Sequence, residues 1–95
     1  MKFVAVIEYV ANADLVGRIR PDHRKYCATL KERGQLAASG PFGDQPGALI
    51  IYEAETLDEA DALLKADPFH AAGVFHRWTL RPWTAATANR SLFPE

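Results

Sequence analysis

Two segments of the chain carry apolar side chains at both odd and even positions, which is the pattern of β-strands buried on both faces. The first covers residues 2–10 and the second covers residues 48–54. Residues 36–40 form a weaker candidate strand, and residues 75–83 form a fourth. A strand that is apolar on both faces belongs in the interior of a sheet. We therefore expect the first and third strands at its centre.

The segment between the first two strands predicts one helix. Pro21 suits the first helical turn, where its missing N–H is not needed, and Gly34 ends the helix just after Arg33. The segment before it, residues 11–19, is polar and mixed, so we expect a loop there. The apolar stripe of the helix consists of Tyr26, Cys27 and Leu30.

A second helix begins at a capping box formed by Thr56 and Glu59, in which the Thr side chain binds the Glu amide and the Glu side chain reaches back. It ends near Asp67, because Pro68 disfavours the helical conformation at the residue before it. Asp67 is also a good N-cap for a short helical turn over residues 68–72. The residues that we expect this helix to bury are Leu57, Ala60, Leu63 and Leu64.

The elements follow the order βαββαβ over residues 1–83, without repeats or linkers. The compact solution is an α+β, ferredoxin-like domain with a four-stranded antiparallel sheet in the order 4-1-3-2 and both helices on one face. The other face is then apolar and uncovered, which soluble monomers rarely tolerate. We expect a second copy to cover it in a homodimer, and exposed strand edges permit larger rings. The tail, residues 84–95, either packs on the partner subunit or is disordered.

Charge and composition limit the kinds of partner that the protein is expected to bind. The 95 residues carry 11 Lys and Arg against 12 Asp and Glu, a net charge of −1, so we expect no nucleic acid and no anionic membrane as partner. No segment approaches the roughly 18 apolar residues of a membrane span, and the N-terminal segment lacks a signal-peptide layout. The single cysteine forms no intrachain disulfide and fits a reducing compartment. We therefore expect a cytoplasmic protein.

The predicted topology brings His23 and Asp67 together, because the start of the first helix lies near the end of the second. The positive end of the helix dipole favours a neutral imidazole, which is a base near pH 7. Asp67 would fix its tautomer, as the acid of a catalytic triad does. The candidate substrate-binding residues at the same edge are Arg20, Gly40, Pro41, Phe42, Asp44 and His70.

The neighbours of this pair have expected roles of their own. Arg20 would hold a substrate carboxylate, and the backbone amides of Gly40 and Gly43 would approach a developing anion. Tyr26 is expected in the core with its hydroxyl at the pocket rim. Cys27 is expected to be a small buried hydrophobe, because a nucleophilic thiol needs a lowered pKa and His23 is its one evident basic neighbour.

The combination of several short motifs carries a family resemblance. These motifs are Arg20-Pro21-Asp22-His23 with Tyr26 and Leu30, Gly40-Pro41-Phe42 with Asp44 and Gly47, Asp67-Pro68-Phe69, and Ala72-Gly73-Val74. With them, residues 1–83 resemble the YciI-like (YCII-related) family. The resemblance implies a dimeric α+β barrel of ferredoxin-like protomers and a His–Asp active site that maps onto His23 and Asp67. One branch of the family resembles dehydrochlorinases of chlorinated hydroxyquinol breakdown, and the wider superfamily includes muconolactone isomerases and haem-handling monooxygenases.

These observations favour a small cofactor-free enzyme in which His23 is the general base or acid and Asp67 orients it. Its reaction would be proton abstraction with elimination or isomerisation on a small acidic or aromatic substrate. The alternative is a non-catalytic module that binds a small ligand or a protein partner at the same edge. A third, weaker hypothesis is haem binding through His23 or His70. No metal site is expected, because no close ligand spacing such as His-x-x-x-His occurs.

Overall fold

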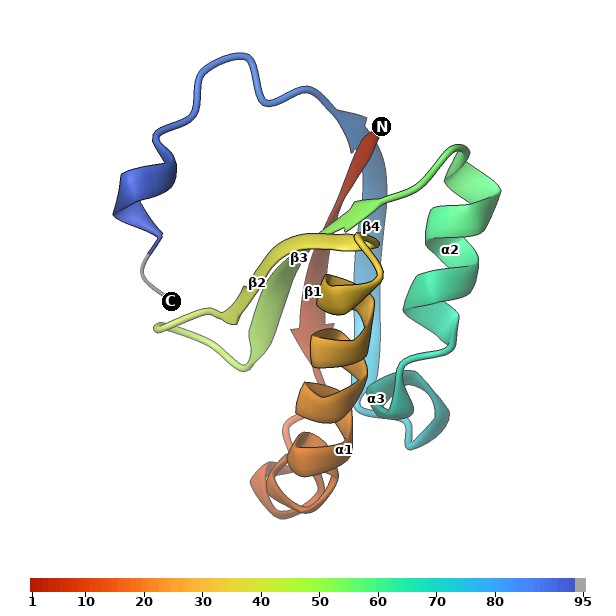
Figure 1. Ribbon diagram of the computed structural model, residues 1–95. Helices are drawn as coiled ribbons and strands as arrows, with labels where there is room; N and C mark the ends of the chain where they lie inside the picture. The colour runs from red at the N-terminus through yellow and green to blue at the C-terminus, as the bar shows by residue number, and fades with distance from the viewer. Residues whose placement is uncertain (94–95) are drawn as a thin grey trace.

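The protein forms one antiparallel sheet with helices against it, as described here for residues 1–93 of a computed structural model (Figure 1). Neighbouring strands are all antiparallel, and the sheet order is β2-β3-β1-β4. This is the predicted order 4-1-3-2 counted from the other edge, so the ferredoxin-like α+β fold is confirmed. The elements are β1 Lys2–Tyr9, α1 Ala13–Glu32, β2 Leu36–Pro41, β3 Gly47–Glu53, α2 Leu57–Lys65, α3 Pro68–Ala71, β4 Phe75–Trp83 and a 3₁₀ turn, η1, at Arg90–Leu92.

The hydrophobic core lies between the two central strands and the helices. Phe3 pairs with Tyr52, and Ala5 pairs with Ile50, across the β1–β3 ladder. All four side chains are at most 2% exposed. Burial of each large apolar side chain contributes roughly 1.5–3 kcal/mol. The core therefore depends on the same two strands whose patterns predicted a central position.

Helix α1 begins at Ala13 rather than at Pro21, so the loop expected over residues 11–19 is wrong. Asn12 caps the helix, and its side chain accepts a hydrogen bond from the Leu15 amide at 3.1 Å. Pro21 lies inside the helix, where it removes one backbone hydrogen bond at a cost of about 3 kcal/mol. The apolar face of the early turns offsets this cost, because it packs against the core through Leu15, Val16 and Ile19.

Helix α2 is capped at its predicted start. Thr56 accepts a hydrogen bond from the Glu59 amide at 3.1 Å, and the Glu59 carboxylate accepts one from the Glu55 amide at 2.9 Å. The expected burial of Leu57 is wrong: this first residue of the helix is 48% exposed. The predicted helical turn after the Asp-Pro corner is confirmed as α3, with Asp67 as its N-cap.

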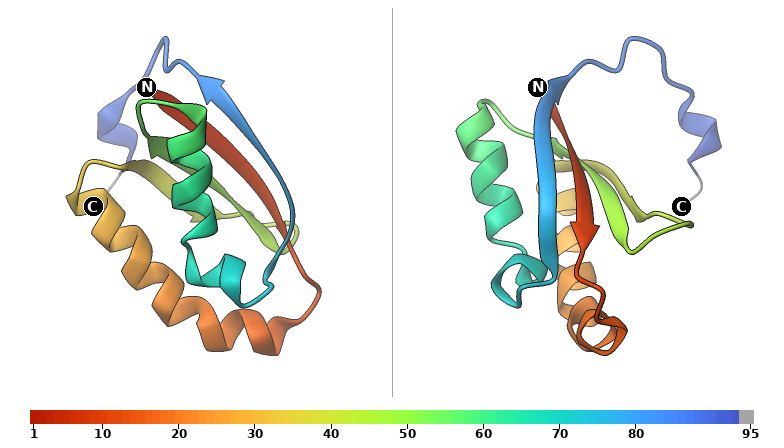
Figure 2. Two further views of the ribbon diagram at one scale, coloured as in Figure 1. Left: turned by 90° about the vertical axis from the view of Figure 1, so that its right-hand side faces the viewer. Right: turned by 180° about the vertical axis from the view of Figure 1, so that it is seen from behind.

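The two long helices lie on one face of the sheet, and the opposite face remains open (Figures 1 and 2). After β4 the chain arches away on the side of the sheet remote from α2 (Figure 2). Leu92 and Phe93 in this tail are 74% and 68% exposed. Among the described residues, no helix is both long and apolar enough to cross a membrane. By strand register, the centre of the open face consists of Val4, Val6, Leu49 and Ile51, with Thr79 and Arg81 beside them on β4.

Gly47 is a position where the fold leaves no room for a side chain. A Cβ atom there would lie 2.3 Å from the backbone oxygen of Ile7, which cannot move without disturbing the β1–β3 ladder. We expect Gly47→Ala to lower the free energy of unfolding by about 2 kcal/mol or more. Denaturant unfolding checks this. The control is Gly17→Ala in α1, where a Cβ would meet open space. This substitution should stabilise the helix by about 0.5–1 kcal/mol. Equal effects from the two substitutions would contradict the prediction.

Candidate functional site

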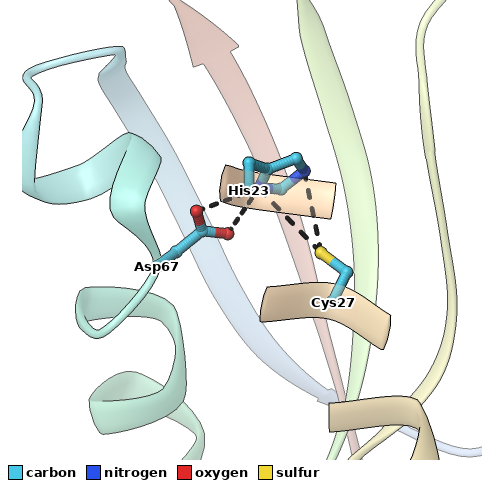
Figure 3. A group of neighbouring side chains, drawn as sticks. All are labelled: His23, Cys27 and Asp67. Carbon is cyan, nitrogen blue, oxygen red and sulfur yellow. Dashed lines mark hydrogen bonds and ion pairs between the residues drawn. The ribbon is translucent and has the colours of Figure 1, made fainter. Parts of the chain in front are cut away.

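The side chains of His23 and Asp67 form a hydrogen-bonded pair (Figure 3). His23 Nδ1 lies 2.7 Å from Asp67 Oδ2 and 2.9 Å from Oδ1. The Asp67 side chain is 0% exposed and the His23 side chain is 12% exposed. A buried carboxylate needs such partners, because removing an unpaired charge from water is costly. The two residues that the predicted topology placed side by side are therefore in direct contact.

Asp67 has two roles at the corner between α2 and α3. Its Oδ1 also accepts a hydrogen bond from the Phe69 amide at 2.9 Å, so the carboxylate caps α3 while it contacts His23. Its backbone is extended, with φ −66° and ψ 132°, the conformation that a following proline favours. The local sequence Asp-Pro therefore sets the direction of the carboxylate before any tertiary contact forms.

His23 lies in the middle of α1, ten residues after its first residue, Ala13. The expected influence of the positive helix end is therefore wrong, because that influence falls off within the first turn. The imidazole instead stacks on the ring of Phe69, with centroids 4.1 Å apart and planes 14° apart. The ring stacking and the contact with Asp67 together fix the position and tilt of the imidazole.

Cys27, one helical turn after His23, completes this cluster. Its Sγ lies 3.7 Å from His23 Nε2 and 3.9 Å from Nδ1, and both the thiol and the Asp67 carboxylate point toward the ring (Figure 3). Burial, reinforced by the negative charge of Asp67, raises the pKa of the Cys27 thiol to about 11. A protonated thiol is a poor nucleophile, so Cys27 acts as packing around the imidazole.

His23, Cys27 and Asp67 also offer three possible metal-ligand atoms within 4.8 Å of one another. Zinc binds cysteine as the thiolate and binds imidazole along a nitrogen lone pair. Here Nδ1 is engaged by the carboxylate, and the sulfur is almost equally distant from both ring nitrogens. This geometry fits a packed hydrogen-bonded cluster better than a preformed metal centre.

A surface hollow of about 500 Å³ lies between the end of β1, the first turns of α1 and the β2–β3 connection. Four of the predicted binding residues line it: Arg20, Pro41, Phe42 and Asp44. Four other residues of the predicted site lie outside its lining: Gly40, His70, His23 and Asp67. The predicted edge thus contains two neighbouring features, a buried His–Asp pair and an open hollow.

Two aromatic residues that the sequence analysis did not assign to the site connect these features. The Phe69 ring stacks on His23 and meets the Tyr9 ring edge-on at 5.2 Å, and Tyr9 lines the hollow. The sequence did hold an indication of both. Tyr9 ends an apolar strand just before a polar connection, and Phe69 follows the Asp-Pro corner.

Two of the remaining polar and aromatic residues of the edge, Tyr26 and His70, have structural contacts. The Tyr26 hydroxyl donates a hydrogen bond to the Leu63 carbonyl oxygen at 2.6 Å, so it joins α1 to α2 instead of facing the pocket rim as expected. The ring of His70 meets that of Trp78 edge-on at 5.5 Å. His76 is exposed on β4.

The fold and the pair define a class: a small ferredoxin-like α+β domain with a buried His–Asp pair beside a surface hollow. The family model of the YCII-related domain matches residues 1–84. The chain belongs to this family, as the motifs around His23 and Asp67 predicted.

Individual relatives support the same assignment. The chain is 33% identical over 75 residues to Protein YciI of Escherichia coli O6:H1, covering 68% of this chain and 76% of the relative. It is 33% identical over 61 residues to the uncharacterized protein YjpA of Bacillus subtilis, covering 64% and 71%.

A solved structure shares the fold. It is 5-chloro-2-hydroxyhydroquinone dehydrochlorinase (TftG) from Burkholderia phenoliruptrix AC1100 in complex with 2,5-dihydroxybenzoquinone. It aligns with a TM-score of 0.78 at 24% identity, over 88% of this chain and 94% of that chain. At this level of identity the match supports the fold.

The raised pKa of the Cys27 thiol predicts slow alkylation. A shift from 9.0 to about 11 is two pH units, so the thiolate fraction at pH 8 falls about 100-fold. The rate of reaction with iodoacetamide should be correspondingly low in the folded protein and rise with pH toward 11. Alkylation in denaturant is the matched control, because unfolding removes the burial. A folded-state rate at pH 8 equal to the denatured rate would contradict the assignment.

Proposed function

We propose that the protein is a small enzyme in which His23 removes or returns a proton and Asp67 orients it. The observation that carries this proposal is the 2.7 Å contact between His23 Nδ1 and the fully buried Asp67 Oδ2. A carboxylate that accepts the Nδ1 proton leaves Nε2, which lies 3.7 Å from Cys27 Sγ, as the basic nitrogen of the ring. A purely structural role of Asp67 as the cap of α3 explains its hydrogen bond from the Phe69 amide. That role does not require a histidine as the second partner of the carboxylate.

The reaction class follows from the chemistry of a lone base without a nucleophile. His23 would take a proton from the substrate, the electron pair of that bond would form a new double bond, and the leaving group would depart with its own electron pair. For a chlorinated hydroquinone the leaving group is chloride. The net reaction is then the loss of HCl, which needs no oxidant. Reprotonation at another carbon in place of chloride loss would give an isomerisation. No cofactor is needed for either reaction.

The hollow supports a small acidic or aromatic substrate. Arg20 supplies a positive charge and Phe42 a partly exposed aromatic ring, which suit an anionic oxygen and a ring respectively. The structural neighbour acts on 5-chloro-2-hydroxyhydroquinone, which has this chemistry. In our proposal the substrate ring occupies the hollow, with its reacting edge toward the His–Asp pair.

Chloride release from 5-chloro-2-hydroxyhydroquinone tests this proposal. We expect His23→Gln and Asp67→Asn each to lower kcat by about 100- to 10,000-fold, the usual contribution of a general base. Asn keeps the capping ability of Asp67, so the fold should survive. The matched control is His76→Gln, which removes an exposed histidine from β4 and should leave the rate unchanged. Full activity in both pair variants would exclude a His–Asp mechanism.

The non-catalytic alternative gives a different result in the same assay. A ligand-binding module would bind 2,5-dihydroxybenzoquinone, as calorimetry would show, without releasing chloride or isomerising related enols. Because the hollow of about 500 Å³ is open on the surface, this alternative has its own structural basis. Turnover by the wild-type protein would exclude it.

We also propose that two copies pair through the open face of the sheet, in the cytoplasm. Val6, at the centre of this face, is 44% exposed, and Trp83 at the end of β4 is also 44% exposed. An apolar sheet face of this kind is stabilised by burial against an identical face. The exposed Leu92 and Phe93 of the tail are then available to contact the partner subunit.

Sedimentation equilibrium tests the pairing. We expect the wild-type protein to be a dimer and Val6→Arg to be a monomer, because each copy would place a charge at the centre of the shared face. Leu57→Arg is the control, since Leu57 is similarly exposed, at 48%, but lies on α2 at the other face. A monomeric wild-type protein, or dissociation caused equally by both variants, would contradict the proposal.

A further inference from the structure

We propose that the hydroxyl of Tyr9 donates a hydrogen bond to the anionic oxygen of a phenolate or enolate bound in the hollow. Tyr9 thereby acts as a positioning and specificity-determining residue for such ligands. The inference deepens the proposed function, since it assigns the chemical class of the ligand and the donor that recognises it. It depends on the hollow as the binding site, but not on whether His23 acts as a base.

Tyr9 lies in the wall of the hollow. It is the last residue of β1, and its amide donates to the Pro46 carbonyl oxygen at 3.0 Å, which ties it to the loop that walls the hollow. Its ring meets Phe69 edge-on at 5.2 Å and stacks with Phe75 at 6.0 Å. Since Phe69 in turn stacks on His23, Tyr9 and Phe69 together link the hollow to the His–Asp pair.

The surroundings of Tyr9 keep its hydroxyl protonated. Burial, together with the negative charge of Asp67, raises the pKa of Tyr9 to about 12, although Arg20 acts in the opposite direction. The phenol is therefore neutral at every pH at which the protein would work, and it remains a donor. Arg20 lines the same hollow as Tyr9, so one ligand bound there can meet both side chains.

The Tyr9 hydroxyl makes no side-chain hydrogen bond with any residue in the described part of the chain. The Tyr26 hydroxyl differs, because it is engaged by the Leu63 carbonyl oxygen at 2.6 Å. The Tyr52 hydroxyl also lacks a partner among residues 1–93, but its residue is only 1% exposed and lies in the core. Tyr9 is partly exposed and lines a hollow, so its donor is free for a ligand.

The Tyr9 hydroxyl is thus a neutral donor, and Arg20 is a cation in the same hollow. A neutral donor beside a cation stabilises an oxyanion more than it stabilises the corresponding alcohol. The expected ligand therefore has one ring, to fit against Phe42, and an acidic hydroxyl. A carboxylic acid without such a hydroxyl would use Arg20 but would gain little from Tyr9.

The test uses 4-nitrophenol, whose ionised form is yellow, so that the ionisation of the bound molecule is read directly from its absorbance. Bound to the wild-type protein, 4-nitrophenol should ionise at a lower pH than it does free in solution. In Tyr9→Phe, which keeps the ring packing and removes the hydroxyl, this midpoint should rise by about one pH unit, a tenfold loss of preference for the phenolate. A substitution that only loosened the packing would weaken the binding of 4-nitrophenol and of its phenolate equally. The midpoint of ionisation would then stay unchanged.

Two control variants distinguish the proposed role of Tyr9 from the loss of any tyrosine hydroxyl and from the proposed role of His23. Tyr26→Phe removes a hydroxyl that is already bound to Leu63, and it should leave the midpoint unchanged. His23→Gln should lower kcat by about 100- to 10,000-fold if the proposed function holds, yet keep the wild-type midpoint, so the two proposals fail independently. The same midpoint in Tyr9→Phe and in the wild-type protein would overturn the role of Tyr9. Absence of 4-nitrophenol binding to the wild-type protein at millimolar concentration would overturn the assignment of the hollow.

Discussion

The structure depends on the burial of one carboxylate. Asp67 is the one charged side chain with 0% exposure among the described residues, and it is kept there by two donors, the Phe69 amide and the His23 imidazole. Without them its desolvation would be uncompensated. The amide belongs to α3 and the imidazole to α1, so this single group joins two elements that are far apart in sequence. The corner where α2 ends is therefore both a structural junction and the centre of the site.

Much of the architecture was predictable because it follows from local rules. The two-sided apolar pattern of β1 and β3 identified the central strands, and the Asp-Pro corner placed the end of α2 and the start of α3. Once the order βαββαβ was known, the ferredoxin-like topology brought His23 next to Asp67. The pair was thus accessible from sequence because its two members lie at positions that are fixed by element boundaries.

The errors arose where tertiary packing outweighed a local preference. Pro21 indicated a helix start, but Asn12 caps the helix nine residues earlier, and the buried early turns compensate for an internal proline. The same error placed His23 in a first turn, and hence near a helix dipole, where it does not lie. The link through Phe69 and Tyr9 was missed for a different reason: an edge-on contact between rings 60 positions apart leaves no periodicity in the sequence.

The double engagement of Asp67 also has an evolutionary consequence. Its bond to the Phe69 amide supports the fold whether or not any reaction occurs, whereas the His23 imidazole is a partner that several polar side chains could replace. A descendant of this protein that lost the proposed proton transfer would be under pressure to keep the acid but free to change the base. Within a lineage, relatives that retain both residues would therefore be expected to share a function. Relatives that retain only the acid would be expected to share only the helix cap that it forms.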